Sequence, residues 1–117
     1  SSADPQQASV VLSHILEKKT LTPADRNKFG IMKCKILLGI SPLIQPGAYQ
    51  DCETKAEAML ENTKDNHLVS ASLSNYLAKS RAELDHILEG YMDFLRAKAH
   101  IEKYRSLNPP VITNETD

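Results

Sequence analysis

Glu83 and His86 have the Glu-x-x-His spacing that places a carboxylate and an imidazole on one face of a helix, as in di-iron helical bundles. Such a centre needs a second copy of the motif and two further inward glutamates. None of the other three histidines has a glutamate three positions before it. The sequence therefore predicts that Glu83 and His86 are solvated, and that the protein holds no metal or other cofactor.

The two cysteines, Cys34 and Cys52, are too few for a disulfide-stabilised scaffold. Cys34 falls within a predicted helix on an apolar stripe, which is the environment of an unreactive thiol. No Gly-x-Ser-x-Gly nucleophile motif or glycine-rich phosphate loop accompanies the serines and histidines. We expect no catalytic residues, and two buried, reduced thiols in an intracellular compartment, cytoplasmic or nuclear. A single Cys34–Cys52 bridge is the alternative.

Four cations border the apolar stripes of the predicted helices: Arg26, Lys33, Lys98 and Arg105. Inward-facing Arg and Lys side chains would let a small helical-bundle enzyme or ligand carrier bind an anion. The simpler interpretation is that their aliphatic stems lie along apolar surface while their charges stay in water. We keep an enzyme or carrier with an anion-binding pocket as the alternative function.

The charges of the chain nearly balance, with 14 Lys and Arg against 15 Asp and Glu. This balance gives no overall attraction to nucleic acid or anionic membrane. The lysines of the second predicted helix lie on opposite sides and have no aromatic residues between them, so we expect no nucleic-acid partner. No apolar run approaches the roughly 20 residues of a membrane-spanning helix.

Glu53, Glu57 and Glu61 recur every four residues and form an acidic ridge along one predicted helix. Like charges at this spacing cost about 0.2–0.5 kcal/mol per pair in an isolated helix. A basic partner would offset that repulsion. We consider the second helix of the chain and another protein as the two candidates, beside the simpler interpretation of a solvated acidic face.

The composition favours an all-α fold with an aliphatic core. Hydrophobic residues make up 41% of the 117 residues, aromatic residues only 5%, and Trp is absent, whereas strands are rich in aromatic and β-branched residues. Capping residues, prolines and the spacing of apolar residues predict four helices, at about 5–19, 23–40, 48–62 and 67–107. We expect one four-helix bundle-like domain over 1–107, with the first three helices packed against the N-terminal half of the fourth.

The segment 67–107 has no proline, and as one helix it would be about 60 Å long. Ser80-Arg81-Ala82-Glu83 matches a capping box, so a break into two helices near residue 80 is the alternative. We favour a continuous or kinked helix that packs on another chain, as in a coiled coil. Residues 108–117 are predicted to form a polar, disordered tail, which includes a glycosylation-type sequon at Asn114.

These helices carry more apolar surface than one small domain can cover, on the second stripe of helix 23–40 and on the distal face of the C-terminal helix. Such patches are typical of interaction sites. The sequence thus predicts a non-enzymatic protein–protein interaction module, a subunit or adaptor of a larger assembly, with self-association through the C-terminal helix as its simplest form. The predicted partner-binding residues are Tyr91, Phe94, Leu95, Ile101, Ile31, Leu38, Glu53, Glu57 and Glu61.

Overall fold

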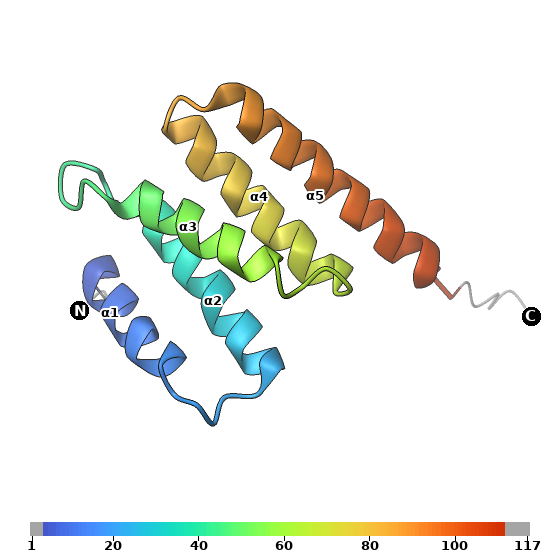
Figure 1. Ribbon diagram of the computed structural model, residues 1–117, viewed down its shortest axis with the longest axis horizontal. Coiled ribbons are helices and arrows are strands. Elements are labelled where there is room, and N and C mark those ends of the chain that lie inside the picture. Colours follow the sequence, from blue (N-terminus) through green and yellow to red (C-terminus); the bar gives the residue numbers. More distant parts are fainter. Residues whose placement is uncertain (1–3, 112–117) are drawn as a thin grey trace, which may run out of the picture.

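A computed structural model describes residues 4–111 as five helices with no strand in that range. The helices, drawn in Figure 1, are α1 (Pro5–Leu16), α2 (Pro23–Leu38), α3 (Ala48–Leu60), α4 (His67–Glu83) and α5 (Ile87–Leu107). The predicted all-α class is confirmed. The sequon at Asn114 and the tail beyond residue 111 lie outside the described residues.

The first two helices begin where their capping signals predict. Asp4 accepts a hydrogen bond from the backbone N–H of Gln6, and Thr22 accepts one from the N–H of Asp25. In both helices a proline occupies the first turn, where its missing N–H costs nothing. Both starts therefore follow from local sequence alone.

The core lies between α2, α3 and α4, and it is aliphatic, as the composition predicts. Leu37 and Leu73 are among its largest fully buried side chains. Cys34 and Cys52 face each other from α2 and α3, both fully buried and both free thiols. The core cluster comprises Cys34, Leu37, Ile40, Ala48, Cys52, Ala56, Leu73 and Leu77.

The two terminal helices lie at the flanks of the molecule, and each packs on a single neighbour. Among the described helices, α1 contacts only α2, and α5 contacts only α4. Figure 1 shows them on opposite sides of an elongated body measuring 58 × 37 × 30 Å. The expectation that all three N-terminal helices pack against the C-terminal segment is therefore wrong for α1.

The prediction of one continuous helix over 67–107 is also wrong. The chain reverses at Leu84–His86, and α5 runs back along α4 (Figure 1). The N–H of His86 bonds to the carbonyl of Arg81, and that of Asp85 to the carbonyl of Ala82, which is the Schellman pattern of a helix end. Asp85 has φ 63°, the left-handed conformation that glycine usually supplies at this position.

The break therefore falls a few residues after the capping-box pattern that starts at Ser80. The Ser80 hydroxyl is fully buried and donates to the carbonyl of Leu77, so it caps no helix start. At Gly90 a Cβ atom would lie only 2.9 Å from the carbonyl oxygen of Ala78. The absence of a side chain at Gly90 thus lets α5 approach α4 closely just after the turn.

Candidate interaction site

The N-terminal half of α5 presents an open apolar side. Ile87, Leu88, Tyr91 and Phe94 are 62%, 72%, 58% and 54% exposed, and Leu95 is also exposed. Six large apolar side chains therefore stand in solvent within nine residues of one helix: Ile87, Leu88, Tyr91, Met92, Phe94 and Leu95. Scattered single apolar residues are normal on a protein surface, but a contiguous patch is typical of an interaction site.

One line of α5 residues follows the alternating spacing of four and three that forms the contact seam of packed helices. This line, named the α5 seam below, consists of Ile87, Tyr91, Phe94, Lys98, Ile101 and Arg105. Its middle members line the groove between α4 and α5. The seam therefore lies along the side of the α4–α5 pair and is not buried between the two helices.

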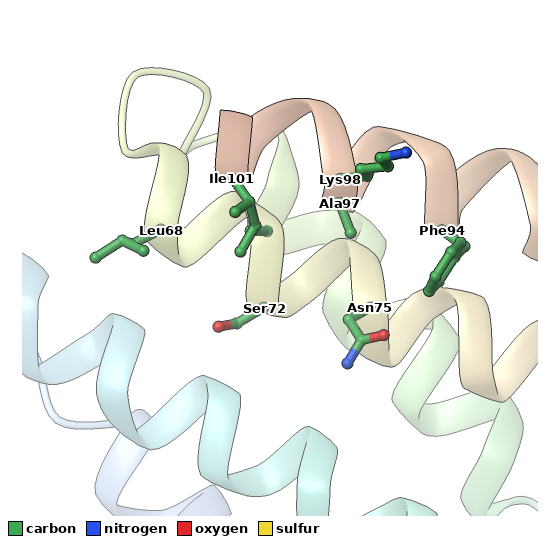
Figure 2. Close-up of a pocket in the computed structure, with 8 residues that line it drawn as sticks. Leu68, Ser72, Asn75, Phe94, Ala97, Lys98 and Ile101 are labelled. Carbon is green, nitrogen blue, oxygen red and sulfur yellow. The ribbon is translucent and has the colours of Figure 1, made fainter. Parts of the chain in front are cut away.

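The groove consists of two adjoining hollows of about 310 and 410 Å³ that meet at Phe94 and Asn75. Figure 2 shows residues that line the first hollow: Leu68, Ser72 and Asn75 come from α4, and Phe94, Ala97 and Ile101 come from α5. The α4 wall is lined mainly by small residues, which leave room for side chains from outside. The charged residues that line the two hollows are Lys79 and Lys98.

The opposite side of α5 is polar and tied to the rest of the fold. Asp93 is 1% exposed, and its carboxylate accepts hydrogen bonds from Arg81 at 2.6 Å and from Arg96 at 2.8 Å. Arg81 also donates to Glu53 at 3.0 Å and to Glu57. Burial alone would lower the pKa of the Arg81 guanidinium, but its hydrogen bonds to Asp93 and Glu53 outweigh that effect and raise it.

The acidic ridge of α3 thus finds its basic partner inside the chain, on α4 instead of on the predicted second helix. Glu53 and Glu57 both bind Arg81. Glu61 forms an exposed ion pair with Lys64 at 3.5 Å. Of the predicted partner-binding residues, these three glutamates therefore already have intramolecular cations.

Ile31 and Leu38, also predicted to bind a partner, pack against the core cluster and are partly buried. Tyr91, Phe94 and Leu95 remain exposed, and Ile101 is partly exposed in the groove wall. The structure thus gathers four of the predicted residues on α5 and places the two α2 residues elsewhere. Ile87 and Leu88, which are also exposed on this part of α5, were not among the predicted partner-binding residues, although they follow the same helical spacing as Tyr91 and Leu95.

The cations proposed for an anion-binding pocket are not brought together. Arg26 donates to the carbonyls of Leu16 and Lys18 and so closes the end of α1. Lys33 lies on α2, and Lys98 lies on α5, which does not contact α2. Of the four cations, only Lys98 lines one of the described cavities, and Arg26, Lys33 and Arg105 line none of them.

A different cavity, of about 410 Å³, lies between α3, α4 and α5 and is lined by Arg81, Arg96 and Lys64. Each of these cations already has a carboxylate partner: Arg81 has three, Arg96 has Asp93, and Lys64 has Glu61. An anionic ligand would have to displace these partners. The cavity is accordingly a poor anion site.

His67 and His100 form a contact that the sequence did not indicate, because they are 33 residues apart. Their Nδ1 atoms lie 3.1 Å apart, which requires at least one neutral ring to accept the hydrogen bond. Burial and the neighbouring His67 lower the pKa of His100. This pair joins the start of α4 to the C-terminal half of α5.

Searches with the sequence and the fold found no matching family model, curated protein or solved structure. Within residues 4–111, no helix combines the length and apolar character needed to cross a bilayer. The same range contains no cluster of three or more His, Cys, Asp or Glu side chains placed to hold a metal ion. The exposed side of α5 is therefore the feature from which a function can be inferred.

Proposed function

We propose that this chain is a non-enzymatic protein–protein interaction module, a subunit or adaptor of a larger assembly, and that the exposed side of α5 is its docking surface. The observation that carries the proposal is the packing of α5 on α4 alone, with its large apolar side chains left open. Burial of apolar surface contributes about 25 cal/mol per Å² removed from water. Aromatic residues such as Tyr91 and Phe94 are enriched at the centres of protein interfaces.

The chemistry of the surface indicates the kind of partner. A hollow with small residues on one wall and aromatic residues on the other accepts side chains from a helix laid along it. The partner surface should therefore be the apolar face of a helix, with few charges at its centre. Because Lys79 and Lys98 border the hollows, acidic residues on the partner would be favourable at the rim.

A photo-crosslinking amino acid placed at position 91, in the cells that make the protein, tests this proposal. The full chain carrying it should form covalent adducts with protein, and the additional change Phe94→Asp should abolish them. The matched control carries the same crosslinker at Gln50, an exposed position of α3. An absence of adducts at position 91, or equal adducts at both positions, would contradict the proposed function.

A further inference from the structure

The residues of one α5 seam match those of a second copy when the two helices run antiparallel. In an antiparallel pair of α5 helices related by a two-fold axis at Phe94, Ile87 of one copy comes opposite Ile101 of the other. The same alignment brings Tyr91 of one copy beside Lys98 of the other, where a cation can lie over an aromatic ring. In such an isologous contact both copies use the same surface, so association ends at a dimer.

The charges at the ends of the seam follow the same alignment. Arg105 of one copy comes opposite the α4–α5 turn of the other, which carries the exposed acids Glu83 and Asp85. A register shifted by one seam position would instead place a cation opposite the apolar Ile87, without a counter-charge. That cation is Lys98 for a shift in one direction and Arg105 for a shift in the other. Both the apolar and the charged positions therefore favour the alignment centred on Phe94.

The available area is sufficient for a reversible dimer. Six exposed apolar side chains at or beside the seam present roughly 600 Å² per copy at about 100 Å² each, or about 1,200 Å² for two copies, which is the lower end of specific interfaces. They are Leu68 of α4 and Ile87, Leu88, Tyr91, Phe94 and Leu95 of α5. Helix α5 has 21 residues and is about 32 Å long, enough for all the seam positions to pair. The expected dissociation constant is accordingly in the micromolar range.

We propose that the partner on this surface is a second copy of the chain, docked through antiparallel α5 seams so that the two α4–α5 hairpins form a four-helix bundle. This inference rests on the proposed function and names the partner for the same surface. In the dimer, the aromatic side chains of one copy enter the hollows of the other beside Phe94. Bundles of antiparallel hairpins with short turns are a common packing solution for such pairs.

Sedimentation velocity of the purified full chain, from about 1 to about 200 µM, tests the dimer. The wild-type protein should shift from monomer to dimer in this range. Phe94→Asp should weaken association at least about 100-fold, since it places a charge at the two-fold axis. The matched control is Leu43→Asp, because Leu43 is 96% exposed in the loop before α3, away from α5.

A charge exchange tests the register. Arg105→Glu should weaken the dimer several-fold by placing like charges opposite each other, and Glu83→Arg should do the same. The double variant Arg105→Glu with Glu83→Arg should recover association close to that of the wild type. Both positions are exposed, so far-UV circular dichroism should show unchanged folding in each variant.

Each outcome decides the proposal. A wild-type chain that stays monomeric over the whole range, or a dimer that Phe94→Asp leaves intact, overturns the second-copy proposal. Failure of the double variant to recover association overturns the register centred on Phe94. If the chain stays monomeric while the crosslinker at position 91 captures a different protein in a Phe94-dependent manner, the proposed function stands and the second copy is excluded.

Discussion

The buried carboxylate of Asp93 should account for a large part of the stability that α5 gains from packing on α4. Its hydrogen bond to Arg81 joins two charged groups that are 1% and 17% exposed, whereas Arg96 is 64% exposed and contributes little. A hydrogen bond between charged groups contributes about 1.5–3 kcal/mol, and a buried ion left without its partner costs about 3–5 kcal/mol. Arg81 keeps Glu53 and Glu57 after the change. We therefore expect Asp93→Ala to lower the free energy of unfolding by about 2–4 kcal/mol.

Urea unfolding at neutral pH, followed by far-UV circular dichroism, measures this loss. The matched control is Glu61→Ala, which removes one member of the exposed pair with Lys64 and should cost less than about 0.5 kcal/mol. Asp93→Asn keeps a hydrogen-bond acceptor without the charge, so it should fall between the wild type and Asp93→Ala. If Asp93→Ala costs no more than Glu61→Ala, the buried network is not what holds α5 in place.

Three further changes test the turn, the histidine pair and the close approach of the helices. Asp85→Gly should raise the unfolding free energy by about 0.5–1 kcal/mol, because glycine adopts φ 63° without strain. In thermal unfolding, Asp85→Gly should therefore raise the midpoint temperature, and Asp85→Ala should lower it. The pKa of His100 is lowered in the folded state, so its neutral ring contributes stability above pH 6.5, and this stability is lost as the pH falls from 6.5 towards the lowered pKa. Urea titrations at pH 7.5 and 5.5 measure the loss of unfolding free energy between the two pH values. This loss should be smaller for His100→Gln than for the wild type or the control His14→Gln. Gly90→Ala should cost about 1–3 kcal/mol in the same unfolding assay, because its Cβ would lie 2.9 Å from a carbonyl of α4, and an unchanged midpoint would contradict that close approach.

The features that the sequence predicted correctly are encoded by neighbouring residues. The starts of α1 and α2 depend on Asp4-Pro5 and Thr22-Pro23, and each cap bonds to an N–H two or three residues away. The reversal at Leu84–His86 is equally local, but its left-handed residue is Asp85 where glycine is the usual signal. A pattern that searches for Gly or Pro passes over such a turn, and the two helices then read as one.

The features that were missed depend on residues far apart in the chain. Arg81 meets Glu53 and Asp93 across separations of 28 and 12 residues, and these pairings arise only when α3, α4 and α5 are assembled. Helical periodicity identified two apolar stripes on α2 but could not tell how far each of them is buried. The structure shows that both reach the core: Ile31 and Leu38 pack against the core cluster from one stripe, and Ile36 and Ile40 do so from the other, whereas Met32 is exposed.

The same interactions that tie one side of α5 to the fold keep its other side open. Rotating α5 about its axis to cover Phe94 against α4 would pull Asp93 away from Arg81 and would leave a buried guanidinium with one carboxylate fewer. The rotation would also bring a residue with a side chain to the place of Gly90, where a Cβ would meet the backbone of α4 at 2.9 Å. The apolar side therefore cannot be buried within the chain by a small adjustment. Its burial requires a surface from outside, and this is why the orientation of α5, more than its hydrophobicity, supports a docking function.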